Sequence, residues 1–178
     1  MNFKEYRLIG LASFFLLIGM NFQCKSQEDF EKRNFKTLKV DLDFNGRRIK
    51  EINDPLYESW VIEEQRKVNK SFGEVNIEFE GDLSSSWYKS GIQAPNYAQL
   101  VSDGLVAEGK LTMTISGLEN GVHSLLTFHN TFDSPEANSF APVDIYVNDK
   151  KVRSVEPSNR VDATVNAAMA YIKFNVEN

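Results

Sequence analysis

The sequence predicts an all-β protein built as an antiparallel β-sandwich. In several short segments apolar residues occupy every second position, which is the period of a strand with one buried face. Pairs of glycine, asparagine and aspartate that favour turns separate many of these segments. Helical periodicity is weak throughout the chain. Many short strands joined by turns are typical of an antiparallel sandwich, whereas a parallel sheet would need helices between its strands.

The alternating segments begin at residue 38. Over residues 38–44 apolar side chains alternate with Lys39, Asp41 and Asp43, which predicts a half-buried strand with one apolar face. Residues 45–46, Asn-Gly, then mark a turn. Further alternating segments lie at residues 75–80, 111–115, 143–147, 161–165 and 172–176, and turn residues lie at 81–82, 117 and 148–149.

Three segments depart from simple alternation. Residues 122–128 form a more continuous apolar run, so we expect a strand that is covered on both faces. Residues 95–105 have apolar and aromatic side chains at i, i+3 and i+4, which predicts one or two helical turns. Residues 63–70 are polar and are expected to form a surface loop or a sheet edge. No repeat of fixed period occurs, which argues against propellers and solenoids.

Residues 1–24 are typical of an export signal. Lys4 and Arg7 form a short positive region, and the 13 residues from 8 to 20 are almost all apolar. A membrane-spanning helix needs about 20 such residues, whereas this length fits the apolar region of a signal peptide. A buried core helix is the alternative. Residues 25–37 are polar and read as a tether, so residues 38–178 are expected to form the folded domain.

Cys24 directly follows the apolar segment and is the only cysteine of the chain. A lone cysteine at this place resembles the lipidated cysteine of bacterial lipoproteins, although Gln23 stands where those proteins usually have a small residue. The polar residues 25–29 are similar to the signal that sends lipoproteins of Bacteroidetes-type bacteria to the outer cell surface. We therefore expect an exported protein held on the outer membrane by a lipid at Cys24, with soluble secretion after nearby cleavage as the alternative.

Composition excludes several classes of function. The chain has 178 residues, 20 Lys and Arg against 25 Asp and Glu, and a net charge of −5. An acidic chain without a basic cluster is a poor nucleic-acid binder, because phosphate neutralisation supplies most of that affinity. A single cysteine excludes a disulfide framework and a zinc knuckle, and two histidines leave little for a His-rich metal centre.

No motif of a known enzyme mechanism occurs. The chain has no GxSxG, HExxH, P-loop or GxGxxG pattern. His123 and His129 are six residues apart on one predicted strand, so about 20 Å separates them and they cannot share an ion. The carboxylates are scattered, and no loop has the density of oxygen ligands that identifies a calcium site. We predict no catalytic residue, no metal ligand and no cofactor, with a structural Ca²⁺ left open.

Aromatic and polar residues occur together in two predicted loops. Trp87 and Tyr88 follow three serines, and Tyr97 follows Asn96. Sugars are bound by this combination, because flat rings pack against their C–H faces while amides and carboxylates bind their hydroxyls. For Trp60 and Trp87 the alternative is burial in the core, since large aromatic side chains are mostly buried.

Residues 87–105, 117–118, 121–130 and 142–148 resemble blocks of galactose-binding-like, malectin-type modules. The resemblance covers residues 38–178 and implies a jelly-roll sandwich of the kind attached to exported polysaccharide-degrading enzymes and surface lipoproteins. Such modules usually end with one more strand, so we expect this sandwich to lack a last strand. The resemblance implies carbohydrate contacts for Trp87, Tyr88, Tyr97, Asp103, His129, Asn130 and Asp133.

Three functions follow as hypotheses. The first is a non-catalytic carbohydrate-binding module whose partner is a polysaccharide or oligosaccharide. The second is the leading part of a polysaccharide lyase or glycoside hydrolase with an appended catalytic domain. The third is a structural or adhesion domain without a ligand.

Overall fold

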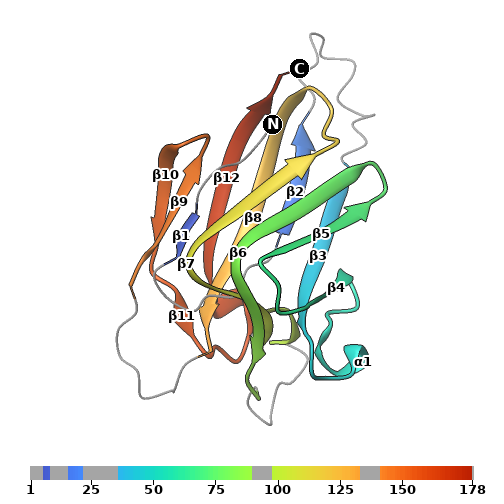
Figure 1. Ribbon diagram of the computed structural model, residues 1–178, viewed down its shortest axis with the longest axis vertical. Coiled ribbons are helices and arrows are strands. Elements are labelled where there is room, and N and C mark those ends of the chain that lie inside the picture. Colours follow the sequence, from blue (N-terminus) through green and yellow to red (C-terminus); the bar gives the residue numbers. More distant parts are fainter. Residues whose placement is uncertain (1–5, 9–15, 22–35, 90–97, 133–140, 178) are drawn as a thin grey trace.

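The computed structural model describes residues 6–8, 16–21, 36–89, 98–132 and 141–177. These residues are mostly strands in two layers, which confirms the prediction of an all-β sandwich (Figure 1). Among the described helices, none has the length and apolar content that crossing a membrane requires.

The first sheet is antiparallel throughout. Its strands, in spatial order, are β10 (Lys150–Val155), β9 (Val143–Val147), β1 (Tyr6–Leu8), β7 (Asp103–Ser116), β6 (Val75–Trp87) and β5 (Lys67–Phe72). The polar residues 63–70, expected to form a surface loop or a sheet edge, include part of β5, which lies at the edge of the sheet. The alternating segments 75–80, 111–115 and 143–147 all lie in strands of this sheet.

The second sheet contains β11 (Ser158–Asn159), β8 (Gly121–Thr131), β2 (Leu16–Asn21), β3 (Thr37–Phe44) and β4 (Glu58–Ile62), in this order. The strand β12 (Ala168–Val176) pairs with β8 along its whole length. The continuous apolar run at 122–128 is part of β8, which is buried on both faces as expected.

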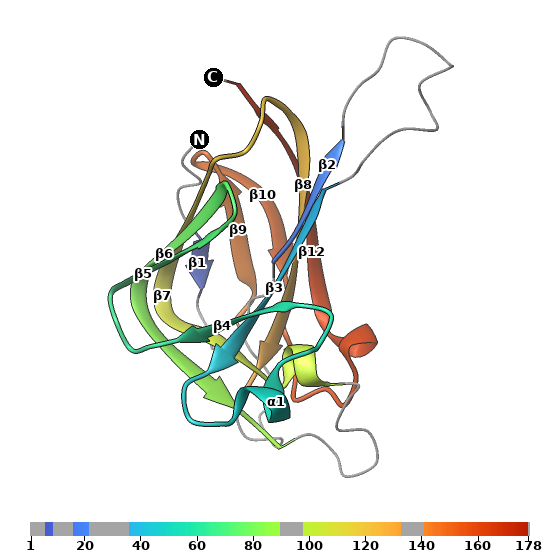
Figure 2. The same cartoon turned by 90° about the vertical axis from the view of Figure 1, so that its right-hand side faces the viewer.

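Two strand pairs are parallel, unlike the purely antiparallel sheets that the sequence predicts. β3 runs parallel to β4, and β8 runs parallel to the short β11. A parallel pair needs a crossover connection, and the chain between β3 and β4 provides it with the short helix α1 (Ile49–Ile52). Figure 2 shows α1 beside the lower end of β3.

The main core fills the space between the two sheets. Fully buried side chains from both layers meet there, among them Leu42, Ile62, Ile77, Phe79 and Leu105. Trp60 is 6% exposed and packs on Phe79, with 5.3 Å between the ring centroids. The structure therefore places Trp60 in the core and not in a binding loop.

A second cluster covers the outer face of β8. Leu125 faces the main core, whereas Phe128, which has the opposite parity on the strand, packs with Leu100 and Val101. These two residues belong to the 3₁₀ turn η3 (Gln99–Val101), and the turn η4 (Thr164–Asn166) precedes β12. Of the helical turns predicted over 95–105, the described part contains this single turn.

The prediction of one buried face for β3 is wrong. Val40 and Leu42 face the main core, but the side chains of Asp41 and Asp43 on the opposite face are also fully buried, each with 0% exposure. The alternation of apolar and charged residues is that of a half-exposed strand, yet other segments cover the charged face. This burial creates the site described below.

The turns follow the local sequence with one exception. Asn148 and Asp149 join β9 to β10 with φ values of 50° and 65°, as a tight hairpin turn requires. Residues 81–82 were expected to end a strand, but β6 continues through them with a register shift against β7. A Cβ on Gly81 would lie 2.8 Å from the Lys110 carbonyl oxygen, so only glycine fits this irregularity.

Two segments of the predicted export signal are strands in this structure. β1 lies between β7 and β9, and β2 lies between β3 and β8. Cleavage after the leader would remove one inner strand from each sheet. The export signal, the lipid at Cys24 and the tether stay predictions, and residues 22–35 lie outside the described part of the chain.

Candidate functional site

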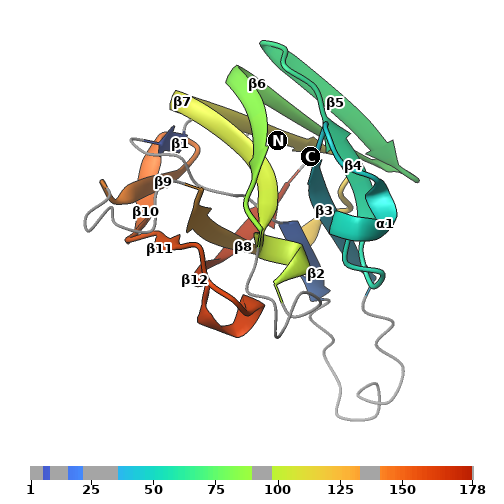
Figure 3. The same cartoon turned by 90° about the horizontal axis from the view of Figure 1, so that it is seen from below.

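The candidate site lies at one end of the sandwich, here called the α1 end. β3 and β6 end there, β7 begins there, and α1 lies next to them (Figures 1 and 3). Asp103, the first residue of β7, is the register partner of Trp87, the last residue of β6. The α1 end therefore brings together strand termini from both sheets.

Three carboxylates, called here the carboxylate cluster, meet inside the α1 end. Asp41 and Asp43 are two positions apart on β3 and so share one face, and Asp103 comes from β7 of the other sheet. One oxygen of each carboxylate lies within 4.8 Å of an oxygen of both others. All three side chains have 0% exposure.

Each carboxylate of the cluster is held by one oxygen only. The Asp41 Oδ2 accepts a hydrogen bond of 2.7 Å from the Asp54 backbone N–H. The Asp103 Oδ2 accepts one of 2.8 Å from the Phe44 backbone N–H, and the Asp43 Oδ2 accepts one from the Ser59 hydroxyl. The Oδ1 atoms of all three are buried without a hydrogen-bond partner in the described structure.

Burial raises the pKa of every carboxyl of the cluster. The pKa of Asp103 rises to about 8, because burial and the Asp43 charge outweigh the hydrogen bond from Phe44. The pKa of Asp43 rises to about 6 through burial, against the opposing hydrogen bond from Ser59 and the charge of Lys70. The pKa of Asp41 is raised well above its usual range by burial and by its two carboxylate neighbours.

Trp87 is the last residue of β6, not part of a loop as the sequence predicts, and part of its side chain is exposed. The Arg47 guanidinium carbon lies 3.9 Å from the centre of the Trp87 ring, which is a close cation–π contact. Arg47 is also 3.9 Å from the Glu51 carboxylate of α1, so the ring and the helix are linked through one side chain. The Ser85 hydroxyl accepts a hydrogen bond of 3.2 Å from the Asn45 N–H beside them.

A separate groove of the α1 end lies along α1 and the segment that follows it, and Trp87 is not among the residues that line it. It is lined by Ile49, Lys50, residues 53–56 and Gln99. The lining combines amide, carboxylate and ammonium groups with the exposed side chain of Leu56, which is 74% accessible. Flat apolar surface beside polar groups is the chemistry that a sugar needs.

Tyr88, His129 and Asn130 belong to the interior. The Tyr88 side chain is 5% exposed; its hydroxyl donates a hydrogen bond of 2.7 Å to the Val161 carbonyl and accepts one of 2.8 Å from the Asn130 amide. Asn130 also donates to the Val101 carbonyl at 3.0 Å. These bonds join the end of β6, η3 and β8, so Tyr88 and Asn130 support the fold around the site.

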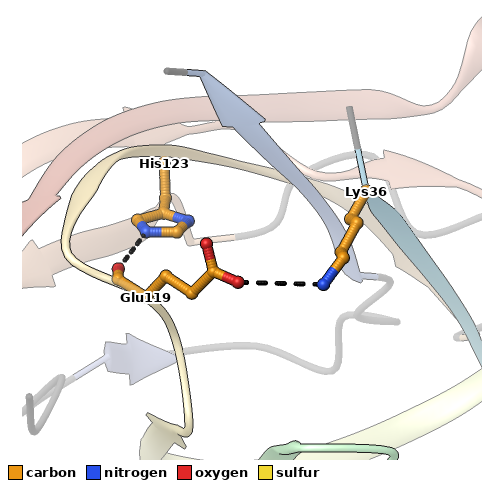
Figure 4. Close-up of polar contacts among 3 residues, drawn as sticks. All are labelled: Lys36, Glu119 and His123. Atoms are coloured by element: carbon orange, nitrogen blue, oxygen red, sulfur yellow. Dashed lines mark hydrogen bonds and ion pairs between the residues drawn. The ribbon is translucent and has the colours of Figure 1, made fainter. Parts of the chain in front are cut away.

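The two histidines of β8 have separate structural environments. His129 has 0% exposure, its Nε2 lies 2.8 Å from the Thr127 hydroxyl, and burial lowers its pKa to about 3. His123 donates from Nε2 to the Glu119 carbonyl oxygen at 2.8 Å, while Lys36 lies 3.7 Å from the Glu119 carboxylate (Figure 4). His123 also stacks on Phe174, with 5.6 Å between the ring centroids.

Seven residues are predicted to contact carbohydrate, and the structure describes five of them. Among these five, Trp87 is the residue whose side chain is accessible to solvent. Tyr88, Asp103, His129 and Asn130 are buried, and no more than 5% of any of them is exposed. A ligand at the surface cannot touch these four side chains in this conformation. Tyr97 and Asp133 lie outside the described residues, as does Cys24.

Sequence reasoning missed Asp41, Asp43 and Arg47. The two aspartates occupy the polar positions of an alternating strand, which usually face solvent. One signal could have identified them: two carboxylates lie on the same face of one strand, and the turn after that strand carries two arginines. Only the tertiary arrangement shows that this face is covered by Asp54, Ser59 and the start of β7.

The fold and the site define an all-β sandwich protein with a buried carboxylate cluster and an accessible tryptophan at one end. Comparisons with models of protein families, with curated proteins and with solved structures found no match.

Proposed function

We propose that this chain is a non-catalytic carbohydrate-binding module of an exported protein, with a jelly-roll sandwich of the galactose-binding-like type. Its partner is a polysaccharide or oligosaccharide that binds at the α1 end. In the proposed setting the module is secreted or is held on the outer membrane by a lipid at Cys24.

The observation that carries the proposal is that the Trp87 ring is held in one orientation and is partly exposed to solvent. Its ring is oriented by the Arg47 guanidinium at 3.9 Å and keeps part of its surface exposed. An aromatic side chain held in one orientation loses little entropy when a sugar packs against it. Trp60, the other tryptophan, is buried in the core, so the two tryptophans have different roles.

A groove of the α1 end supports the same function. The groove beside α1 offers the amides of Asn53 and Gln99 and the carboxylate of Asp54 next to the apolar surface of Leu56. Sugar hydroxyls need such donors and acceptors, while the pyranose faces need apolar contact. A flat polar end with both tryptophans buried would instead favour a structural domain.

Affinity electrophoresis on plant, algal and host polysaccharides, followed by a glycan array, tests the proposal. We expect retardation by at least one glycan and a 5- to 150-fold weaker affinity for Trp87→Ala, equivalent to about 1–3 kcal/mol for a central aromatic contact. Tyr171→Ala is the matched control, because Tyr171 is an exposed ring, 49% accessible, with Lys173 at 5.9 Å from its centre. Lack of retardation on every polysaccharide, or equal losses for the two variants, would contradict the proposal.

The two alternatives have their own tests. Reducing-end and unsaturated-product assays on the purified chain would detect a glycoside hydrolase or a lyase. The carboxylate cluster does not favour such an enzyme, because its three side chains have 0% exposure and a polysaccharide cannot reach them. A structural or adhesion domain predicts that neither turnover nor glycan binding is found.

A further inference from the structure

The carboxylate cluster contains polar atoms inside the protein that have no hydrogen-bond partner among the described residues. Asp41, Asp43 and Asp103 each have 0% exposure, and each has an Oδ1 atom that accepts no hydrogen bond from the described residues. A buried polar atom without a partner is costly, and a buried carboxylate without a counter-charge is more costly still. Either protons or a bound cation must therefore compensate the cluster.

The described protein cations supply little of this compensation. Lys70 acts on Asp43, but its ammonium donates a hydrogen bond of 2.5 Å to the Ser59 carbonyl oxygen. No other lysine or arginine of the described residues is among the groups that act on the three carboxyls. In the described part of the chain, one ammonium therefore acts on Asp43, and none acts on Asp41 or Asp103.

The geometry of the cluster matches the coordination sphere of a metal ion. One oxygen from each carboxylate lies within 4.8 Å of the corresponding oxygens of the other two. Oxygens bound to one Ca²⁺ at 2.3–2.6 Å can be up to about 5 Å apart, whereas those bound to Mg²⁺ at 2.0–2.1 Å are at most about 4.2 Å apart. The ligand atoms are all carboxylate oxygens, which favours a hard cation over zinc or copper.

The backbone holds these ligands in place before any ion binds. Asp41 and Asp43 project from one face of a paired strand, and the Asp54 and Ser59 hydrogen bonds occupy the other oxygen of each. Asp103 is anchored by the Phe44 N–H of the opposite sheet. The three Oδ1 atoms remain available, and a site with fixed ligands binds with a smaller loss of entropy.

We propose that Asp41, Asp43 and Asp103 bind one divalent cation through their Oδ1 atoms, with Ca²⁺ as the preferred ion. Water and main-chain oxygens complete the six to eight ligands that Ca²⁺ takes. The ion links the end of β3 in one sheet to the start of β7 in the other. It acts as a structural clamp of the α1 end, and it does not require that the module bind a glycan.

Calorimetric titration and thermal melting of the full chain test the site. The protein is first treated with EDTA and dialysed, and CaCl₂ or MgCl₂ is then added. We expect one Ca²⁺ to bind per chain, and Ca²⁺ at 100 times its Kd to raise the Tm by roughly 5–10 °C. Mg²⁺ should give a smaller increase. Absence of a Ca²⁺ heat signal and of a Tm shift up to 10 mM would overturn the proposal.

Single substitutions separate a cation site from a cluster neutralised by protons. Asp43→Asn and Asp103→Asn should each reduce the Ca²⁺ affinity at least tenfold and remove most of the Tm increase. In EDTA the same variants should melt at or above the wild-type temperature, because each replaces a buried ionisable carboxyl by a neutral amide. Asp149→Asn is the control, since Asp149 is an exposed turn residue with φ of 65° that asparagine tolerates. An unchanged Ca²⁺ response in both cluster variants would refute the assignment.

Discussion

Replacing Tyr88 by Phe removes one hydroxyl from the interior and leaves the ring in place. That hydroxyl donates to the Val161 carbonyl at 2.7 Å and accepts from the Asn130 amide at 2.8 Å. The remaining ring still packs against Phe132, with 5.8 Å between the centroids. The substitution therefore isolates two hydrogen bonds that join the end of β6 to β8 and to the segment before η4.

The magnitude follows from the partners that the substitution leaves behind. A buried group that loses its hydrogen bond costs about 1–3 kcal/mol. The Asn130 amide keeps its bond to the Val101 carbonyl, and Val161 is only half-buried, so water partly compensates its carbonyl. We expect Tyr88→Phe to lower the free energy of unfolding by about 2–3 kcal/mol, and the Tm by roughly 4–12 °C for a domain of this size.

Urea unfolding followed by Trp fluorescence measures this change, with Tyr171→Phe as the control. The Tyr171 side chain is 49% exposed, so the loss of its hydroxyl should change the free energy by less than 0.5 kcal/mol, about the limit for surface substitutions. Glycan affinity should be the same for Tyr88→Phe and for the wild type. A stability loss below 0.5 kcal/mol for Tyr88→Phe, or a selective loss of glycan binding at unchanged stability, would refute the assignment of Tyr88 to the interior.

Two further predictions concern His129 and the leader. Burial lowers the His129 pKa to about 3, so below its unfolded pKa of about 6.5 the unfolded chain takes up a proton that the folded chain does not. The His129 contribution to stability is therefore complete above pH 6.5 and falls by about 1.4 kcal/mol per pH unit towards pH 3. The urea midpoints of the wild type and of His129→Gln should converge as the pH is lowered. A constant difference between the two midpoints at every pH would contradict this. Removal of residues 1–24 deletes β1 and β2, which leaves β3 and β8 each without one neighbour and exposes strand edges that favour association. Light scattering after size exclusion should then show oligomers for residues 25–178, and a monodisperse monomer would show that the sheets close without the leader.

Local sequence was sufficient to identify several turns and six of the twelve described strands, which are β3, β6, β7, β8, β9 and β12. The strand that alternation predicts at 161–165 is absent, and the turn η4 begins there instead. The period of two placed strands around residues 38–44, 111–115, 143–147 and 172–176, and the structure has strands at each. The Asn148-Asp149 turn could also be predicted, because its backbone requires positive φ values that these residues tolerate. These features depend on neighbours along the chain, which are visible in the sequence itself.

Partners that are distant in the sequence could not be predicted in this way. The parallel pairing of β3 with β4 depends on a crossover that has no strong signal of its own. The jelly-roll connectivity and the carbohydrate ligand stay predictions. Of the expected binding residues, the sequence could not separate Trp87, which keeps an exposed surface, from Tyr88, which turns inward one position later.

That this protein is built of strands could be inferred from its residues alone, because alternation and turn chemistry act over a few residues. The meeting of Asp41 and Asp43 with Asp103 away from water becomes visible in the packed sheets, since Asp103 lies about 60 residues further along the chain than Asp43. Burial and charge compensation depend on the groups that surround a residue in space. A polar residue on a strand faces solvent until another part of the fold covers it.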